Sequence, residues 1–384
     1  MLARDQLLDD ARRLSGLDDY GDLRFAEGLG VLVDSINTEA ALTAEAEHGI
    51  AQEILRNLVN RLRMQRDLVR HPEILDEEVL SPIFVTSLPR TGSTKLHRML
   101  GATGDFNALP FWMSFNFAPF PGTKPNTPDP RIAAAEDYLQ WMVKKAPLYQ
   151  QGHPQYATEV EEELSLLDAG FNSLYRWAAQ LQVPSYVDWV LKNAGLAALH
   201  DLRALIQYIQ WQHYRGLRRR WVFKTPSLFG FEAAYAAVFQ DTDFIITHRN
   251  PEDTWPSVCM LFCGVRGLYN DADVSQIAAE AMLHNFSEAL PSHLAWRAQY
   301  PADKVLDVRF ADVASREIGL MHEIYAWLGL EFSAASEAKL RAWLAMDAQR
   351  GHQRNRTQLA DYGIEPARLR ERLGGYYARY GAFF

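Results

Sequence analysis

A short apolar run that passes through a tight loop into a helical segment constrains the fold of this chain more than any other feature. The run Pro82-Ile-Phe-Val-Thr86 continues into Ser87-Leu-Pro-Arg-Thr-Gly-Ser-Thr94 and then into the helical segment Lys95-Leu-His-Arg-Met-Leu100. Small and hydroxyl-bearing residues between a strand and a helix let backbone N–H groups converge on an anion, and the helix N-terminus adds about half a positive charge. The sequence therefore predicts a strand, an anion-binding loop and a helix.

Three further apolar runs extend this pattern along the chain. Trp221-Val-Phe-Lys-Thr225, Asp243-Phe-Ile-Ile-Thr247 and Val305-Leu-Asp-Val-Arg309 have the length and composition of buried strands, and helical spacing fills the segments between them. Strands that alternate with helices favour a parallel sheet covered by helices. We therefore predict an α/β fold with a P-loop-like central parallel β-sheet flanked by helices.

The remaining segments are organised around this core. Residues 1–80 read as an N-terminal helical extension, and residues 82–375 as the core, within a single domain of residues 1–384. A large, mostly helical and loop insertion spans about 105–215. Its first part, from Phe106 to about Gln155, is irregular and has six prolines between Pro110 and Pro130, which is typical of a lid or binding loop. Helical spacing returns from Thr158 to about Gln212.

Composition excludes several classes of function. The 384 residues carry 39 Lys and Arg against 48 Asp and Glu, a formal charge of −9, which argues against a nucleic-acid partner or an anionic membrane surface. No window approaches the roughly 18 apolar residues of an integral membrane span. The only cysteines, Cys259 and Cys263, indicate no disulfide framework. We expect a cytoplasmic protein, and the sequence leaves its oligomeric state open, with a homodimer as one option.

The anion loop differs from the loop of ATPases, G-x-x-x-x-G-K-[ST]. Ser87 replaces the first glycine, Gly92 is in register, Ser93 stands at the lysine position and Thr94 fills the last position. The later strands end in cations, where a carboxylate would organise Mg²⁺ in an ATPase. No cluster of His, Cys, Asp and Glu has metal-ligand spacing, so we predict no metal.

Taken together, three motifs resemble a known family. Ser87–Thr94, Trp221-Val-Phe-Lys-Thr-Pro226 and Thr247-His-Arg-Asn-Pro-Glu-Asp-Thr-Trp-Pro-Ser257 closely resemble the sulfotransferases that use 3′-phosphoadenosine 5′-phosphosulfate (PAPS), in their bacterial form, over roughly Pro82 to Gly375. The resemblance implies PAPS as donor and 3′-phosphoadenosine 5′-phosphate as product. It also implies that Arg249 and Ser257 hold the 3′-phosphate, and that the 5′-phosphosulfate is bound by the loop residues Pro89, Arg90, Thr91, Gly92, Ser93 and Thr94.

Two further donor contacts follow from the resemblance. Phe310 stands where relatives often have a tyrosine, so it could stack on the adenine, although core packing is an equal interpretation. The run Arg350-Gly-His-Gln-Arg-Asn-Arg356 resembles the basic C-terminal segment that closes over the 3′-phosphate, which makes Arg354 and Arg356 candidate ligands. A solvated basic loop is the alternative.

Sulfuryl transfer needs positive charge on the departing phosphate and a base for the acceptor. Arg90 and Lys224 are the candidate cations. Cytosolic relatives place a histidine after the Lys-Thr pair, but here Pro226 stands there. The segment Thr158–Leu164 resembles a Glu-Glu element of the bacterial branch, with Glu161 and Glu162 aligned, and Glu162 is the preferred base. An exposed, acidic helix start is the competing interpretation, and His153 and His97 are the reserve bases.

The acceptor we expect is a small-molecule or lipid-like hydroxyl compound of hydrophobic character, because positive charge outside the donor motifs is scarce and aromatic residues are plentiful in the insertion. Two other functions remain open. A P-loop kinase or NTPase-like phosphotransferase would require Mg²⁺ and a lysine at the Ser93 position. A non-catalytic nucleotide-binding protein would keep Arg249 and Ser257 yet tolerate loss of Arg90 and Lys224. The presence of all four groups favours an enzyme.

Overall fold

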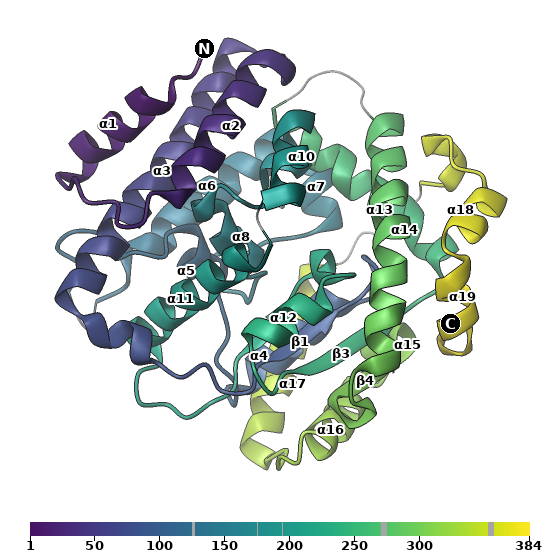
Figure 1. The fold of residues 1–384 in the computed structure, drawn as a ribbon. Coiled ribbons are helices and arrows are strands. Elements are labelled where there is room, and N and C mark those ends of the chain that lie inside the picture. The colour runs from purple at the N-terminus through teal and green to yellow at the C-terminus, as the bar shows by residue number, and fades with distance from the viewer. Residues whose placement is uncertain (125–126, 175, 194, 270–274, 352–356) are drawn as a thin grey trace.

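A parallel sheet forms the centre of the computed structural model, which describes residues 1–384 except 125–126, 175, 194, 270–274 and 352–356 (Figure 1). In the described residues the sheet has four strands in the order β2-β1-β3-β4, all parallel. The strands are β1 (Ile83–Thr86), β2 (Val222–Lys224), β3 (Asp243–His248) and β4 (Val305–Arg309). The predicted α/β fold is confirmed.

Each face of the sheet packs against a different apolar core. Phe84 of β1 lies between Phe223 of β2 and Phe244 of β3, with ring centroids 5.2 and 6.0 Å away, and belongs to a core that extends to the N-terminal helices. Ile83 and Val85 belong to a second core, on the other face. Successive strand residues point to opposite faces, so a sheet covered on both sides needs the continuous apolar runs that the sequence contains.

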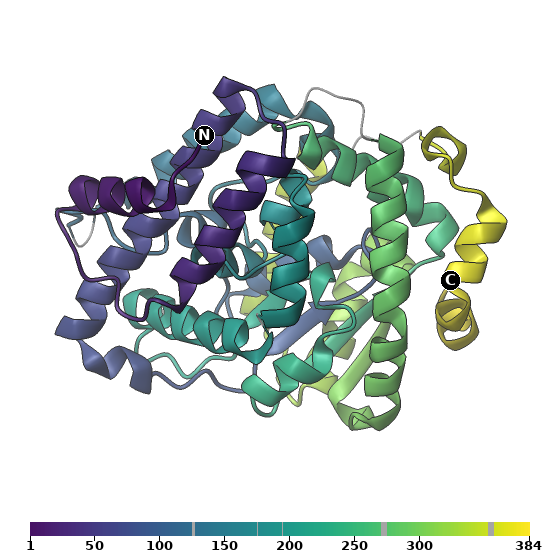
Figure 2. The same ribbon diagram turned by 45° about the horizontal axis from the view of Figure 1, so that its top comes forward.

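The N-terminal segment is helical, as predicted. Its helices are α1 (Arg4–Ser15), α2 (Arg24–Glu39) and α3 (Ala44–Arg70), followed by the 3-10 turn η1 (Pro72–Asp76). In both ribbon views these helices lie on the side of the molecule opposite the C-terminal helices (Figures 1 and 2). Their apolar residues share one core with the insertion and the sheet.

The insertion is more helical than the proline pattern suggested. The prediction of an irregular segment from Phe106 to Gln155 is wrong for its second half, because Asp129 caps a helix that begins at Pro130. Proline at the first helical position gives up no hydrogen bond, so it starts helices as readily as it ends them. After α4 (Ser93–Thr103), the helices are α5 (Phe111–Phe115), α6 (Pro130–Lys145), α7 (Pro147–Gly152), α8 (Leu164–Leu167), α9 (Arg176–Gln180), α10 (Pro184–Asn193) and α11 (Gly195–His213).

The C-terminal half supplies helices to both faces of the sheet and ends beside α13 and α14 (Figure 1). It contains α12 (Glu232–Val238), α13 (Pro251–Arg266), α14 (Ser275–Gln299), α15 (Phe310–Ser315), α16 (Glu317–Trp327), α17 (Ala334–Arg350), α18 (Pro366–Arg372) and α19 (Gly374–Tyr380). Further 3-10 turns are η2 (Asp168–Gly170), η3 (Pro226–Leu228), η4 (Ala302–Lys304), η5 (Leu359–Tyr362) and η6 (Gly381–Phe383). None of the helices in the described parts of the chain is long and apolar enough to cross a membrane.

Candidate active site

The predicted anion loop connects β1 to the N-terminus of α4. Two of its residues have left-handed backbones, Arg90 with φ +71° and Gly92 with φ +88°. The Thr91 hydroxyl donates to the carbonyl of Leu88 at 3.0 Å and lies 2.7 Å from the hydroxyl of Thr247, at the end of β3. The loop is therefore fastened both to itself and to the neighbouring strand.

The loop contains polar groups without a protein partner. The hydroxyl of Ser87 is fully buried and has no hydrogen-bond partner among the described residues. Ser93, the first residue of α4, is also buried, and Gly92 holds the N-cap position with no side chain to cap the helix. An unsatisfied hydroxyl beside uncapped helix N–H groups fits a bound anion.

Two arginines come together beside the loop. The Nε of Arg90 donates to the hydroxyl of Ser257 on α13 at 2.9 Å. Burial and the nearby charge of Arg249 both lower the pKa of Arg90. Across the described ranges, neither arginine forms an ion pair with a carboxylate. Two like charges in one place repel each other unless an anion compensates them, so this is the strongest indication of an anion site.

Phe310 completes this group of residues. The register of β3 and β4 pairs His248 with Arg309, so the residues that follow them, Arg249 and Phe310, emerge side by side. The Arg249 guanidinium lies 4.1 Å from the centre of the Phe310 ring. A Cβ atom on Gly92 would lie 3.1 Å from the same ring. The loop, the strand end and Phe310 thus meet, whereas Arg354 and Arg356 lie outside the described residues.

The second predicted group is the acidic cluster, which we define as Glu161, Glu162 and Glu163. All three carboxylates are buried, with at most 6% of each residue exposed. They precede α8, in a segment whose Glu161 N–H donates to the carbonyl of Leu109 at 2.8 Å. The competing interpretation, an exposed helical turn, is therefore wrong.

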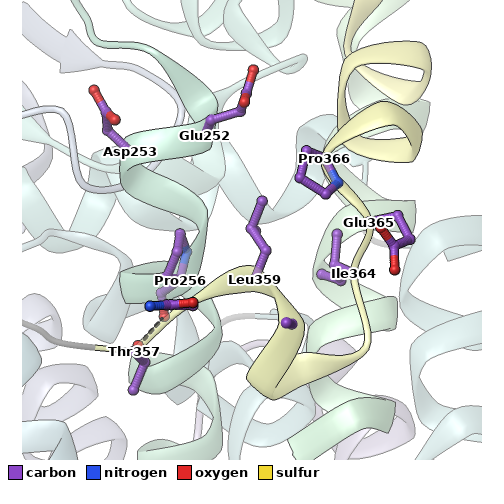
Figure 3. A pocket seen from close by; sticks show the side chains of 10 residues that line it. Glu252, Asp253, Pro256, Thr357, Leu359, Ile364, Glu365 and Pro366 are labelled. Atoms are coloured by element: carbon purple, nitrogen blue, oxygen red, sulfur yellow. Dashed lines mark hydrogen bonds between the residues drawn. The ribbon is translucent and has the colours of Figure 1, made fainter.

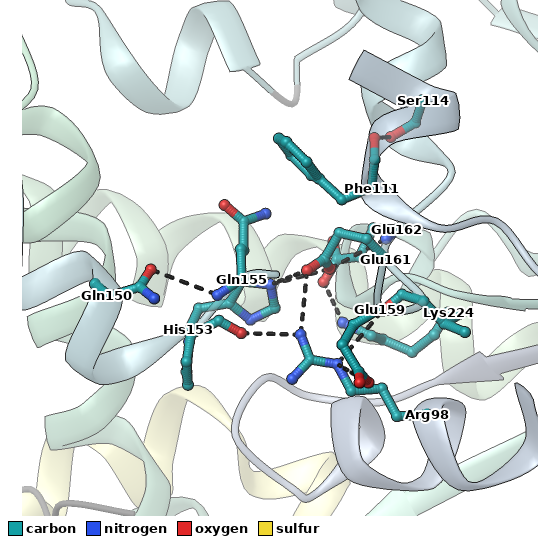
Figure 4. A network of polar contacts seen from close by, with 12 residues as sticks. Arg98, Phe111, Ser114, Gln150, His153, Gln155, Glu159, Glu161, Glu162 and Lys224 are labelled. Atoms are coloured by element: carbon teal, nitrogen blue, oxygen red, sulfur yellow. Dashed lines mark hydrogen bonds and ion pairs between the residues drawn. The ribbon is translucent and has the colours of Figure 1, made fainter. Parts of the chain in front are cut away.

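Cations compensate two members of the acidic cluster (Figure 4). Glu162 forms an ion pair with Lys224, the last residue of β2, and both side chains are buried. Glu161 lies 3.0 Å from Nε2 of His153 and 3.5 Å from Arg98 of α4. Burial alone would raise the pKa of Glu161, but His153, Lys224 and Arg98 lower it far below its usual range. Glu161 is thus a carboxylate held in its ionised form.

Sequence reasoning did not single out Glu163 or Arg98. Glu163 is completely buried, accepts the backbone N–H of Lys224 at 3.2 Å, and has a second oxygen without a partner in the described structure. Burial, with repulsion from Glu162, raises the pKa of Glu163 to about 8. The only sequence signal was its membership of the acidic run, because the contacts that bury it come from residues far along the chain.

Among the described residues, one group of side chains has the geometry to hold a metal, contrary to the expectation from the sequence. The ligand atoms of His153, Glu161 and Glu162 all lie within 4.8 Å of one another. The two carboxylates, however, already face Arg98 and Lys224. A divalent cation would have to displace these cations or repel them, so the donor set does not fit a metal.

The other reserve base and most of the insertion aromatics have structural roles. His97 is buried, with Nε2 3.1 Å from the carbonyl of Val222, and burial and then the charge of Lys224 lower its pKa to about 3. An imidazole so disfavoured as a cation is a poor proton acceptor. Many of the aromatic residues of the insertion are packed in the main core, namely Phe111, Trp112, Phe115, Phe117, Phe171 and Trp177.

Comparisons with known proteins identify the family of this chain. The model of the sulfotransferase family matches residues 82–334. The crystal structure of sulfotransferase STF1 from Mycobacterium tuberculosis H37Rv is 28% identical, with a TM-score of 0.77 over 97% of this chain and 99% of that chain. Sulfotransferase STF9 from Mycobacterium avium is 22% identical, with a TM-score of 0.85 over 98% and 96% of the two chains. Curated protein sequences gave no significant match.

The match covers more than half of the chain and includes the anion loop, the acidic cluster, β2 and the Arg249 region. The predicted family is thereby confirmed, and the chain belongs to the sulfotransferase family.

Proposed function

We propose that this protein transfers a sulfuryl group from PAPS to a hydroxyl group of a hydrophobic small-molecule or lipid-like acceptor. The observation that carries this proposal is the pair Arg90 and Arg249, held beside an anion loop without a compensating carboxylate in the described structure. A donor with phosphates at both its 5′ and 3′ positions would supply the missing negative charge.

Different residues would bind the 5′-phosphosulfate and the 3′-phosphate of the donor. Residues Pro89–Thr94 and the N-terminus of α4 would hold the 5′-phosphosulfate, with the buried hydroxyl of Ser87 as an additional donor. Arg249 and Ser257 would hold the 3′-phosphate. Arg249 covers one face of Phe310, so adenine stacking would use the other face. When bound, PAPS supplies the sulfuryl group and leaves as 3′-phosphoadenosine 5′-phosphate.

Glu162 is the base that we favour for the acceptor hydroxyl. Among the carboxylates of the acidic cluster, Glu161 is already bound by His153 and Arg98, and Glu163 is protonated at neutral pH. Glu162 forms an ion pair with Lys224, the last residue of β2 and the candidate cation for the departing phosphate. When Glu162 takes the proton of the acceptor hydroxyl, the ion pair loses its negative member, and Lys224 becomes free to stabilise the departing 5′-phosphate.

The donor is tested by calorimetry with 3′-phosphoadenosine 5′-phosphate and, separately, with ATP and Mg²⁺. We expect metal-independent binding of the first ligand and about 100-fold weaker binding by Arg249→Ala, because a charged, forked contact is lost. Arg316→Ala is the matched control, since this arginine pairs with surface carboxylates on α15 and α16. A preference for Mg-ATP would favour a phosphotransferase instead.

The base is tested with Glu162→Gln, which keeps a polar partner for Lys224 but cannot accept the proton. Transfer of radiolabelled sulfate from PAPS to a panel of hydrophobic alcohols and phenols should slow by about 10²- to 10⁴-fold, with the affinity for 3′-phosphoadenosine 5′-phosphate nearly unchanged. Binding without transfer by the wild type to any member of the panel would support the non-catalytic alternative.

A further inference from the structure

The residue that precedes Arg249 is held by the C-terminal helix. His248 is fully buried at the end of β3, with Nδ1 2.9 Å from the Tyr376 hydroxyl and Nε2 2.8 Å from Asp307. The ring of Tyr380 stacks on the imidazole with centroids 4.2 Å apart. Burial lowers the pKa of His248, so the ring is neutral and has a single N–H. From this network we assign that proton to Nε2, with Tyr376 donating to Nδ1.

Tyr376 binds the residue next to Arg249, and Tyr380 packs on the same imidazole. Burial raises the pKa of Tyr376 well above its usual value, so its hydroxyl keeps the proton that it donates to His248. The neighbouring Tyr380 is fixed from behind, because its hydroxyl lies 2.7 Å from Nε2 of His293, whose Nδ1 lies 2.7 Å from Glu232. His248 thus connects α19 to the end of β3, and His293 connects α19 to α14 and α12.

The C-terminal helices also bind residues that follow Arg249. Asn250 caps α13, the helix that carries Ser257, and its side chain accepts a hydrogen bond from Tyr377 at 3.3 Å. Glu252, in the first turn of α13, receives two hydrogen bonds from Arg370 of α18, at 2.6 and 2.8 Å. Figure 3 shows the C-terminal segment running along α13, where the Thr357 hydroxyl donates to the carbonyl of Pro256 at 3.3 Å.

The C-terminal segment also reaches the Phe310 side of the site. Arg309, which directly precedes Phe310, donates to the carbonyl of Ala382 at 3.3 Å. Residues 374–384 therefore bind both the residue before Arg249 and the residue before Phe310. Neither Arg249 nor Phe310 is fully buried. Their positions therefore depend on the residues that precede them in the chain.

We propose that the C-terminal segment, residues 357–384, is a positioning element for the 3′-phosphate site, and that the Tyr376 hydroxyl positions Arg249 through His248, the residue before it. This inference rests on the proposed donor-binding function of Arg249. Tyr376 is a positioning residue, because it acts through His248. Its hydroxyl sets the direction in which the strand end presents the guanidinium.

The test compares Tyr376→Phe with Tyr300→Phe. Tyr300 is a matched control because its hydroxyl donates to the carbonyl of Thr242 at 2.8 Å, just before the opposite end of β3. Calorimetry with 3′-phosphoadenosine 5′-phosphate and with adenosine 5′-phosphate separates the 3′-phosphate contact from the rest of the site. Thermal unfolding of both variants reports any general loss of stability.

We expect Tyr376→Phe to bind 3′-phosphoadenosine 5′-phosphate about tenfold more weakly, the size of one buried hydrogen bond, while its affinity for adenosine 5′-phosphate stays the same. Tyr300→Phe should leave both affinities unchanged. Equal weakening of both ligands in Tyr376→Phe, or wild-type affinity for both, would overturn the positioning role alone. Failure of the wild-type protein to bind 3′-phosphoadenosine 5′-phosphate would overturn the proposed donor and this inference together.

Discussion

At the scale of single residues, the charged groups of this site differ in what compensates them. Arg90 and Arg249 lack a carboxylate partner in the described structure, whereas Glu162 and Lys224 neutralise each other. Glu163 differs from both pairs, since it is buried without a cation of its own and stays protonated at neutral pH. In our proposal the first pair binds an anion and the second pair moves a proton, whereas we expect Glu163 to make the stability of the folded state depend on pH.

The stability of the fold should therefore fall with rising pH through Glu163. Its pKa is about 8 in the folded protein against 4.5 as the ordinary value, so between these limits the folded state binds more protons than the unfolded state. The free energy of unfolding then decreases with pH, by at most about 1.4 kcal/mol per pH unit from this residue. Glu163→Gln should remove that decrease.

Urea unfolding of wild type and Glu163→Gln at several pH values from 5 to 8 measures this effect. Asp168, whose pKa is raised to about 7 by burial, stays in both proteins, so the difference between the two isolates Glu163. The advantage of the variant should grow steadily with pH. If the free energies of unfolding of the two proteins change in parallel with pH across this range, Glu163 is already ionised in the folded state.

At the scale of elements, the loop between β1 and α4 depends on its glycine. Gly92→Ala adds strain at φ +88° and places a Cβ 3.1 Å from Phe310, so we expect both a loss of about 1–2 kcal/mol of stability and weaker binding of 3′-phosphoadenosine 5′-phosphate. Gly104→Ala, at φ +75° at the other end of α4, is the control, because its new Cβ meets the flexible tip of Lys339.

Calorimetry and thermal unfolding of the two glycine variants separate the two effects. Both should lose stability, but Gly104→Ala should keep the wild-type affinity. If both variants bind the ligand equally well, the contact between Gly92 and Phe310 does not shape the site.

The same elements show what a sequence can predict. The strands and the anion loop were predictable because an apolar run and a small-residue turn are local features. The burial of the acidic cluster was not, since Leu109 and Lys224, about 50–60 residues away, turn a polar run into an interior one. The start of α6 had a local signal in Asp129-Pro130, a cap followed by a first-turn proline, which the surrounding prolines obscured. The roles of the individual site residues stay predictions.

At the scale of the whole molecule, a buried polar network joins the N-terminal helices to the insertion. Glu53 of α3 is paired with Arg176 of α9 at 2.7 Å and accepts the hydroxyls of Tyr138 and Tyr269 at 3.0 and 2.8 Å. Arg176 also pairs with Asp168 at 3.0 Å. These contacts cross the boundary near residue 80 that the sequence suggested, which supports our proposal that residues 1–384 form a single domain.

Removing Glu53 should test that proposal. Glu53→Ala leaves the buried Arg176 with less compensation, and we expect a loss of about 3–5 kcal/mol from the free energy of unfolding. Glu45→Ala, which breaks a surface pair between α3 and Lys145 of α6, should leave it nearly unchanged. Tryptophan fluorescence and circular dichroism should report one coincident urea transition in each protein, whereas two separate transitions would contradict a single domain.

The order of the strands also has a consequence during synthesis of the chain. β1 lies in the interior of the sheet, yet its partners β2 and β3 begin only at Val222 and Asp243. At about 5–20 residues per second, the ribosome needs on the order of 10 seconds or more to make the first partner. Throughout that time four consecutive residues that end up fully buried have no strand to pair with. The nascent chain therefore has to shield β1, with its own early helices or with a chaperone, before any sheet can exist.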